Sequence, residues 1–463
     1  MTKLYDYIIV GSGAAGGLLA YNLSAAGART LLLEAGPYLD KTSYPRSEAD
    51  GSARLYWGGG MEFSQDARMA FLRGRVVGGS TVVNQALMDR FDDLALDDWC
   101  DECGGIDFFN LEKLAPYYEW VEQHLALHTF QEYERNRNAD LFVKGCDAEG
   151  YHWHYLRRGQ SDCAFEKGND CIGCLGGCHR GSKQSTLEAF IRQAQEMGLE
   201  LQAGTSVERL EIQAGQVRVF CQRNGKLEEF AGRRVILSAG AFGTTRLMYL
   251  SGFQGRFPAL GKYFSSHPQF MFFGLYDEPV DAHKGEFQTV ASKDQDFRKS
   301  GFKLENVFAG PATTAMLFSP YGLRHQELMR KYRYLTCAEC AVRDENAGQI
   351  KVNKKGRLVV DKPLTDQDRN RMRQGTEVLK QVLAASGAKE VIESPFYFGL
   401  HLMGGCRMGV DPNKSVVDPE FRVHGFQDLY ICDSSLFPSS PGINPCLTVM
   451  ALARRLSVQL CGN

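Results

Sequence analysis

The sequence predicts an α/β fold in which a Rossmann-type dinucleotide-binding domain is interrupted by a second domain made of a sheet and helices. Three observations predict this class. The first forty residues read as strand, glycine turn, helix and strand. A buried strand runs into another glycine turn at 234–247, and the segment from 396 onward returns to this pattern. The length of 463 residues exceeds that of one core, so the domains are expected to be interleaved along the chain.

The first glycine turn, Gly-Ser-Gly-Ala-Ala-Gly at 11–16, lies between an apolar strand pattern and an alanine-rich helix pattern. Gly11 permits the tight turn, Gly13 lets the backbone approach a pyrophosphate, and Gly16 lets helix and strand pack closely. The phosphates would bind the free N–H groups at the start of the helix. Glu34 follows Gly16 by 18 residues and is placed to accept a hydrogen bond from a ribose hydroxyl. The motif predicts a dinucleotide without distinguishing FAD from NAD.

The composition narrows the class of protein. Because 53 basic and 55 acidic residues give a net charge of −2, there is no global field to recruit nucleic acid or an anionic membrane, and a small, uncharged or mixed substrate is expected. No run of 18 apolar residues predicts a transmembrane segment, and the apolar start is used by the first strand, so a cytoplasmic protein is expected. Fourteen cysteines are then expected to be free, redox-active or metal-bound rather than paired in disulfides.

Strand and helix patterns follow the turn along the chain. Residues 56–60 and 73–84 hold six glycines and small polar residues, which let the backbone lie flat against a planar ligand. Short alternating strands after residue 198 indicate a small antiparallel insert. The predicted helices span 14–26, 111–127, 185–197, 366–385 and 445–456, and the predicted strands span 199–202, 206–213, 216–223, 228–230, 234–237, 270–276, 334–342, 349–352 and 358–360.

At its glycine-rich segments the chain resembles the glucose-methanol-choline (GMC) oxidoreductases, a family of FAD enzymes. Residues 74–84 are similar to the family's first signature, which covers the flavin, and residues 234–252 to its second, where the chain returns to the FAD. The resemblance implies FAD as the cofactor and the GMC fold, an FAD-binding domain interrupted by a sheet-plus-helix substrate domain. Besides the glycine turn and Glu34, the residues that it places at the FAD are Gly78, Gly79, Ser80, Asn84, Val207 (beside the adenine), Ala239, Gly240 and Asp433.

A third segment, 260–268, resembles the family motif L-G-x-N-x-x-D-H-P. Tyr263 and Ser266 stand where the family usually has Asn and Asp, so no contact is carried over to these two positions.

The last segment contains the residues predicted to carry the chemistry. His401 is followed by Leu-Met-Gly-Gly-Cys-Arg-Met-Gly, and Asn444 lies 43 residues further on, before a proline. Oxidation of an alcohol removes a hydroxyl proton, which needs a base of near-neutral pKa such as imidazole, and a second polar group must orient the hydroxyl. The motif looks like the catalytic turn of GMC alcohol oxidases and dehydrogenases, which implies His401 as the base and Asn444 as its partner. The alternatives are a histidine satisfied in the core and a turn asparagine.

The resemblance implies an enzyme that acts on CH–OH donors. An alcohol would be oxidised to a carbonyl by hydride transfer to flavin N5, and the electrons would pass to an acceptor, for which a carrier is slightly preferred over O₂. Two other functions stay open, a GMC-fold lyase without net redox and a flavin and cysteine redox sensor. The expected domains are an FAD-binding domain at 1–125, 185–266 and 396–463, a cysteine-rich excursion at 126–184 and a substrate-binding domain at 267–395.

Four cysteines lie close together in the expected excursion, namely Cys163, Cys171, Cys174 and Cys178. The last three fall within eight residues and are separated by glycines, so they can converge on one centre, with Cys163 as a fourth ligand. Some GMC dehydrogenase subunits are similar and bind an iron–sulfur cluster near C-x-x-x-C, and a cluster here would favour an electron carrier or a partner subunit as acceptor. Zinc and free thiols are the alternatives.

Overall fold

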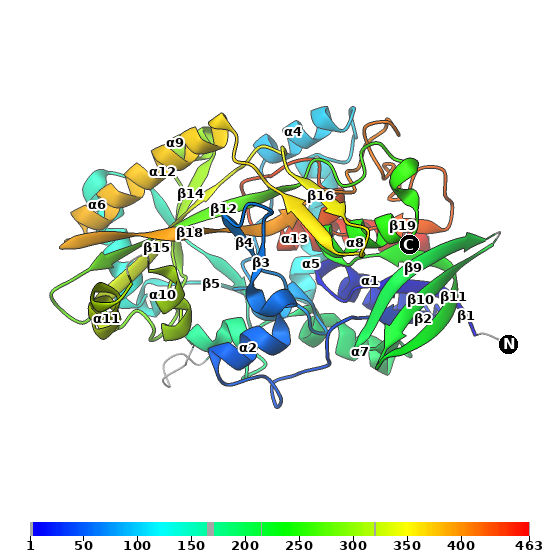
Figure 1. Cartoon of the computed structure of the whole chain (residues 1–463), viewed down its shortest axis with the longest axis horizontal. Helices are drawn as coiled ribbons and strands as arrows, with labels where there is room; N and C mark the ends of the chain where they lie inside the picture. The colour runs from blue at the N-terminus through cyan, green and yellow to red at the C-terminus, as the bar shows by residue number, and fades with distance from the viewer. Residues whose placement is uncertain (1–2, 164–170, 214, 319–320, 463) are drawn as a thin grey trace.

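The computed structural model describes residues 3–163, 171–213, 215–318 and 321–462. Two large sheets lie along the long axis of the molecule (Figure 1). The sheet that contains the N-terminal strand lies at one end, and a second sheet, crossed by the long strand β18 (Glu390–Met403), lies at the other. The α/β class predicted from the sequence is confirmed.

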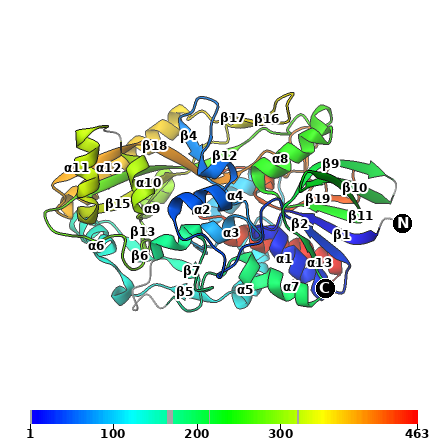
Figure 2. The same cartoon turned by 60° about the horizontal axis from the view of Figure 1, so that its bottom comes forward.

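The first sheet has the order β8-β2-β1-β11-β10-β9, with β19 also paired to β11. Its strands β8, β2, β1, β11 and β19 are parallel neighbours, as a Rossmann-type domain requires. In Figure 2, α1, α13 and α7 lie on one side of this sheet and α8 on the other. These elements are β1 (Leu4–Val10), α1 (Ala14–Ala25), β2 (Thr30–Leu33), α7 (Arg192–Glu196), β8 (Glu200–Gln202), β9 (Thr205–Gln213), β10 (Gln216–Arg223), β11 (Lys226–Leu237), α8 (Gly240–Leu250), β19 (Leu429–Ile431) and α13 (Cys446–Cys461).

Strand β11 corrects the sequence reading, which has two separate strands at 228–230 and 234–237. The structure has one continuous strand there, and its two halves pair with different partners. Its first half pairs antiparallel with β10, and Val235–Leu237 pairs parallel with β19. Gly232 lies where the two halves meet, and a Cβ there would come within 2.8 Å of Ile8 Cγ1 on β1. The antiparallel insert and the parallel sheet therefore share a strand.

The second sheet has eight strands in the order β3-β4-β18-β12-β15-β14-β13-β6, antiparallel except for the β4–β18 pair. Helices α6 and α12 pack on one face of it, against buried side chains that include Phe272, Leu304 and Cys340. These elements are β3 (Glu62–Phe63), β4 (Met69–Phe71), α6 (Arg137–Glu149), β6 (Trp153–Tyr155), β12 (Ser265–Leu275), β13 (Val290–Ser292), β14 (Phe302–Asn306), β15 (Leu335–Val342) and α12 (Asp366–Ala385).

Segments from 62–71 and 153–155 thus pair with strands from 265–403. Both segments precede the expected substrate-binding span in the sequence. The two large sheets are therefore built from interleaved stretches of chain, while the domain limits themselves stay a prediction.

The remaining elements are short and lie around the two sheets. Near residues 185–197 the expected helix is a π-helical turn, Leu187–Ile191, followed by α7. The remaining helices and strands are α2 (Glu48–Leu55), α3 (Ser80–Val83), α4 (Asp93–Glu102), α5 (Leu111–His124), β5 (Leu127–Thr129), β7 (Arg157–Gly159), α9 (Gln295–Ser300), α10 (Pro311–Leu317), α11 (Leu323–Arg330), β16 (Gln349–Val352) and β17 (Leu358–Asp361). Within the described ranges no helix is long and apolar enough to cross a membrane.

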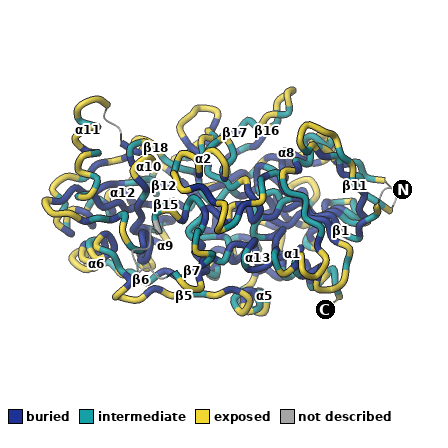
Figure 3. Tube along the Cα trace, turned by 90° about the horizontal axis from the view of Figure 1, so that it is seen from below, coloured by how far each residue is buried: buried dark blue, intermediate teal, exposed yellow. Residues whose placement is uncertain are grey.

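Burial follows this arrangement. In Figure 3 the trace is mostly buried along β1, α13, β12 and β15 and mostly exposed at α11 and at the outer loops. The functional residues described next lie among the buried segments.

The packing of α12 on the second sheet can be tested at Leu379, which is fully buried there. We expect Leu379→Ala to lower the free energy of unfolding by about 2–5 kcal/mol, because it removes buried methyl groups and leaves a cavity. Gln374→Ala, an exposed change on the same helix, is the control. Urea unfolding followed by circular dichroism measures both, and equal effects of the two variants would contradict this packing.

Candidate active site

The glycine turn after β1 has the geometry that a dinucleotide needs. Gly11 has φ +98°, and a Cβ on Gly16 would come within 1.9 Å of the Gly11 carbonyl oxygen, so neither position accepts a side chain. Gly13 differs, because a Cβ built there meets no atom within 4 Å. Helix α1 starts at Ala14 without a side-chain cap, which leaves its first N–H groups available to a pyrophosphate. The residues present therefore fit the phosphates of FAD.

Glu34, at the end of β2, is buried and holds the turn from the side. Its Oε2 accepts from the Ser12 N–H (3.0 Å) and Ser12 Oγ (2.7 Å), and its Oε1 accepts from the Gly36 N–H (2.8 Å). Burial raises the pKa of this carboxyl, and the three hydrogen bonds and Arg75 oppose that shift. Its role toward a ribose stays a prediction.

The loop that starts at Gly78 lies directly on the glycine turn. The Gly78 N–H donates to Ser12 Oγ (2.9 Å), and a Cβ on Gly79 would come within 2.8 Å of Gly13 Cα. Ser80 Oγ accepts from the Gly74 N–H (3.0 Å), which closes the loop on itself. Further on, Asn84 Oδ1 accepts from the Ala86 N–H (3.0 Å).

Asp433 links the segment after β19 to the segment after β11. It is buried, and its Oδ2 accepts from the Gly240 N–H (2.8 Å) and Thr244 Oγ1 (2.6 Å), while its Oδ1 accepts from the Ser435 N–H (2.7 Å). Burial raises its pKa. Ala239 lies beside this contact, because its N–H donates to Thr244 Oγ1 (3.1 Å).

The predicted cofactor residues therefore cluster at one edge of the first sheet. Gly11, Glu34, Ala239 and Asp433 each come within two residues of the carboxyl end of a parallel strand: β1, β2, β11 and β19 respectively. Ligands of open α/β sheets bind at this edge. Val207, near the start of β9, lies two residues after Thr205, whose N–H donates to the Glu34 carbonyl (2.8 Å).

His401 owes its orientation to a bulge in β18. Ser265 and His267 of β12 pair with Met403 and Leu400, so two residues of β18 face one of β12. His401 is one of these two residues and has φ +56°, an unusual value for a residue with a side chain. A bulge with this backbone re-aims a side chain. Here it brings Nδ1 of His401 to 2.8 Å from Nδ1 of His267.

The His267 ring has a defined protonation pattern. Its Nε2 accepts from the Gly442 N–H (2.9 Å), and a backbone N–H can only donate. A neutral His267 therefore carries its proton on Nδ1 and donates it to Nδ1 of His401, whose own proton is then on Nε2. Burial lowers the pKa of His267 well below its ordinary value and that of His401 to about 4, with Glu305 opposing and Lys303 adding to the shift at His401. Both rings are neutral near pH 7.

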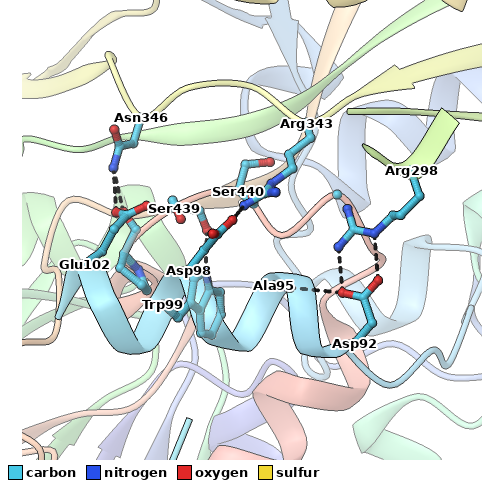
Figure 4. A network of polar contacts seen from close by, with 12 residues as sticks. Asp92, Ala95, Asp98, Trp99, Glu102, Arg298, Arg343, Asn346, Ser439 and Ser440 are labelled. Atoms are coloured by element: carbon cyan, nitrogen blue, oxygen red, sulfur yellow. Dashed lines mark hydrogen bonds and ion pairs between the residues drawn. The ribbon is translucent and has the colours of Figure 1, made fainter. Parts of the chain in front are cut away.

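Helix α4 fixes the loop that carries Gly442 and Asn444 (Figure 4). Trp99 Nε1 on this helix donates to the Ser439 carbonyl (3.1 Å), and Arg343, the residue after β15, donates to the Ser440 carbonyl (2.8 Å) and pairs with Asp98. Figure 4 also shows Arg298 of α9 paired with Asp92, Asn346 donating to Glu102, and the N-cap bond within α4 from the Ala95 N–H to Asp92. The loop is therefore held between α4 and the second sheet.

An ion pair that the sequence analysis missed, between the half-buried Lys303 and the buried Glu305, lies beside Asn444. Lys303 Nζ on β14 is 2.5 Å from Glu305 Oε1 and 3.5 Å from Asn444 Oδ1. Glu305 is 2% exposed. Nothing in the sequence distinguished this pair, since Lys-Leu-Glu reads as an ordinary strand with one solvated face. Only the fold shows that this face is buried.

Ser266, near the start of β12, stands where the family usually has Asp, and Asp344 from another segment contacts it. The Ser266 N–H donates to both carboxylate oxygens of Asp344 (3.2 Å each), and Asp344 pairs with Lys362 (2.7 Å) in full burial. Burial raises the pKa of Asp344 to about 7, and Lys362 opposes that shift. A carboxylate from another segment therefore contacts this strand next to His267.

The cysteine-rich segment packs against the loop over the glycine turn. Lys183 Nζ, which is buried, donates to the carbonyls of Val82 (2.9 Å), Asn84 (2.6 Å) and Cys174 (2.7 Å). The Cys178 thiol hydrogen-bonds that of Cys174, and this contact and burial raise its pKa. Residues 164–170 and the side chain of Cys171 lie outside the description, and among the described residues no three potential ligands converge on a metal position.

Comparisons with known proteins define the family. The N-terminal and C-terminal family models of the GMC oxidoreductases match residues 52–269 and 344–453. The chain belongs to the GMC oxidoreductase family. This confirms the family and the enzyme class expected from the sequence, an oxidoreductase acting on CH–OH donors, and FAD is the cofactor that the family binds.

Among curated relatives, the chain is 28% identical to an uncharacterised GMC-type oxidoreductase, y4nJ, of Sinorhizobium fredii, over 98% of this chain and 94% of that protein. It is also 28% identical to long-chain-alcohol oxidase FAO4B of Arabidopsis thaliana, over 98% of this chain and 67% of that protein. An oxygen-dependent choline dehydrogenase of Vibrio vulnificus is 26% identical over 98% and 94%.

Solved structures share the fold. Pyridoxine 4-oxidase from Mesorbium loti superposes with a TM-score of 0.76 at 17% identity, over 99% of both chains. Formate oxidase from Aspergillus oryzae gives a TM-score of 0.72 at 17% identity, over 99% of this chain and 98% of that one.

The two glycines of the turn allow a matched test of FAD binding. We expect Gly13→Ala to fold nearly as the wild type but to retain less FAD, because its methyl group enters the space left for the pyrophosphate. Gly16→Ala should instead destabilise the FAD-free protein by about 1–3 kcal/mol, because its Cβ meets backbone. Flavin absorbance and thermal unfolding of the FAD-free proteins separate the two effects. Full FAD retention by Gly13→Ala would refute the placement of the phosphates.

Proposed function

We propose that the protein oxidises an alcohol to a carbonyl with bound FAD, with His401 as general base and Asn444 as the group that orients the hydroxyl. The observation that carries this proposal is the contact between His401 and His267, which turns the histidine of the family's catalytic motif toward the loop of Asn444. Relatives named long-chain-alcohol oxidase and choline dehydrogenase are consistent with an alcohol substrate.

Bound FAD would supply the hydride acceptor at its N5 atom. The residues that would hold it are the glycine turn at 11–16, the loop at 78–84 and the start of α8 beside Asp433. His401 and Asn444 would hold the alcohol so that its C–H bond points toward that acceptor.

His401 enters the reaction as a neutral ring. In the pair as it stands, Nε2 of His401 carries a proton and can donate to the alcohol oxygen but cannot accept from it. Acceptance requires the other tautomer, in which His401 Nδ1 donates to His267 and His401 Nε2 is free. That tautomer puts a proton on His267 Nε2, where the Gly442 N–H now donates. We infer that the Gly442 peptide turns away from His267 before the alcohol proton is taken, while Ser439 and Ser440 keep their contacts with Trp99 and Arg343.

Asn444 is suited to orientation rather than to proton transfer. Its Oδ1 lies 3.5 Å from the Lys303 ammonium, which directs the amide oxygen toward β14. The amide NH₂ group can then donate to the alcohol oxygen, because an amide presents its oxygen and its nitrogen on opposite sides. The pair of His401 and Asn444 would thus fix the hydroxyl from two directions.

The acceptor of the electrons is proposed to be a carrier in slight preference to O₂, a choice that depends on the cysteines. An iron–sulfur cluster at Cys163, Cys171, Cys174 and Cys178 would support a carrier, whereas zinc or free thiols would not. Iron, sulfide and zinc analysis of anaerobically purified protein decides among the three. Comparison of oxygen uptake with dye reduction then measures the acceptor directly.

The deciding experiment for the function is anaerobic mixing of the purified protein with a panel of alcohols. Loss of the flavin absorbance with carbonyl formation supports alcohol oxidation. Product without any net flavin reduction would favour a lyase, and flavin that responds only to thiol oxidants would favour a redox sensor.

Removal of the proposed base tests its role. We expect His401→Ala to retain FAD and to lower alcohol oxidation by about 10²- to 10⁴-fold, the usual contribution of a positioned base. Asn444→Ala should also lower turnover, through the orientation of the hydroxyl. Stopped-flow flavin reduction measures both variants. A wild-type rate in either variant would show that the residue lacks the assigned role.

The acid limb of the pH profile gives a second test. Because burial lowers the pKa of His401 from 6.5 to about 4, its neutral, active form persists below pH 6.5, and kcat/KM should fall only at more acidic pH. Lys303 lowers this pKa and Glu305 raises it, so Lys303→Met should move the limb to higher pH and Glu305→Gln to lower pH. The assignment of His401 as the base would be contradicted if both variants moved the acid limb in the same direction. A wild-type acid limb above pH 6.5 would also contradict it.

A further inference from the structure

The backbone next to His267 is held by two other segments of the chain. The Ser266 N–H donates to both carboxylate oxygens of Asp344 (3.2 Å each), and the Ser266 carbonyl accepts from Ser440 Oγ (3.1 Å). Ser266 and Ser440 are completely buried. Further along the loop of Ser440, the Gly442 N–H donates to the His267 ring (2.9 Å). Asp344 and this loop therefore hold His267 from two sides.

Asp344 is flanked by residues that are attached to helix α12. Arg371 of this helix donates to the Arg343 carbonyl (2.7 Å). On the other side of Asp344, the Glu345 N–H donates to Asp368 Oδ1 near the start of the same helix (2.8 Å). Helix α12 packs on the second sheet through its apolar side chains. The carboxyl is therefore presented to β12 by a segment that a regular element holds in place.

Lys362 completes the surroundings of this carboxyl. Its Nζ lies 2.7 Å from Asp344 Oδ2, and both side chains are completely buried. An ionised carboxyl only accepts hydrogen bonds, so it matches the ammonium and the Ser266 N–H together. A buried ion pair often adds no stability over apolar residues of similar volume. The contact of this pair with the strand of His267 therefore indicates a role in the site rather than in stability.

The proposed proton transfer makes the contact with Asp344 more important. The Gly442 peptide turns away from His267 in that step, so the His267 ring loses a donor that orients it. The hydrogen bonds from the Ser266 N–H to Asp344 do not involve Gly442. They can therefore keep His267 beside His401 while the proton moves.

We propose that Asp344 is a positioning residue of the active site, which holds the Ser266 peptide so that His267 stays in hydrogen-bond contact with His401. The inference rests on the proposed alcohol oxidation for its effect on rate. Without this carboxyl, the ring of His401 would be less well placed against the alcohol. A misplaced base lowers the rate of the chemical step more than it weakens the binding of substrate.

Three variants separate the role of the carboxyl from that of the fold. The removal variant, Asp344→Ala with Lys362→Met, eliminates both charges, so that no buried ammonium is left without its partner. The transfer variant, Asp344→Ala with Ser266→Asp, moves the carboxyl to residue 266. Ser266 Oγ lies 3.4 Å from Asp344 Oδ2, so a carboxyl on residue 266 can reach Lys362. Asp361→Asn changes an exposed acid next to Lys362 and is the control.

Anaerobic stopped-flow mixing with the best alcohol of the panel measures the effect on the reaction. We expect the removal variant to keep its FAD and to reduce the flavin about ten- to hundredfold more slowly at saturating alcohol, with the dissociation constant for the alcohol within about threefold of the wild type. The transfer variant should regain most of this rate, because its carboxyl ties residue 266 to Lys362 directly. The control should react as the wild type does.

Hydrogen–deuterium exchange of the FAD-bound proteins without alcohol measures the peptide independently of any reaction. We expect the proteolytic fragment that contains Ser266 and His267 to exchange faster in the removal variant. Fragments from β1 and α13, which lie in the first sheet and its covering helices, should exchange as in the wild type.

The outcomes separate this inference from the proposed oxidation. A removal variant that unfolds at lower temperature but keeps the wild-type rate and local exchange would overturn the inference, because Asp344 would then have a structural role alone. Equal loss of rate in the removal and transfer variants would also overturn it. If no alcohol reduces the wild-type flavin, the oxidation fails, and exchange alone decides whether Asp344 holds His267. If the removal variant does not fold, Asp344→Asn takes its place, with a smaller loss of rate expected.

Discussion

The hydrogen bond between His267 and His401 is the interaction on which the proposed site depends. It joins β12 and β18 through side chains at the point where their main-chain register breaks, and it requires the left-handed backbone of His401. For a residue with a side chain that backbone costs about 1–3 kcal/mol, which the surrounding structure must supply. The neighbours that compensate this cost include the loop at 438–444. Trp99 of α4 and Arg343 hold this loop, and its Gly442 N–H donates to His267. Rigid neighbours thus maintain a strained residue that the chemistry needs.

The second constraint is the shared edge of parallel strands. β1, β2, β11 and β19 come from the two ends and the middle of the chain, yet their carboxyl ends meet because they are neighbours in one sheet. The loop over the glycine turn adds a fourth segment through the contact of Gly78 with Ser12. A cofactor bound across all these ends would require the chain to return to the first sheet after building the second, which agrees with the interleaving of the chain.

Sequence reasoning predicted those parts of the structure in which one residue type has one physical reason. Gly11 and Gly16 are required by φ or by close approach, and the regions at Glu34, Asp433 and His401 follow recognisable patterns. Sequence reasoning failed where contacts between distant segments of the chain decide the local structure. The sequence predicts two strands where the structure has β11, because the two halves differ in polarity. In the structure one strand pairs antiparallel with β10 over its first half and parallel with β19 over its last residues. The bulge at His401 has no local signature, and Lys303 and Glu305 alternate with apolar residues as in any half-exposed strand. Burial of that face depends on which segment covers it.

The ion pair of Lys303 and Glu305 lies on this covered face of the sheet, which bears on its role. Replacement of a buried ion pair by apolar residues of similar volume is often neutral or stabilising, so the pair is weak evidence for a role in stability. Its place on the face opposite α6 and α12, within reach of Asn444, gives it an electrostatic role instead. Burial is the main reason that His401 is neutral, and the ammonium adds to this effect on its pKa while the carboxylate opposes it.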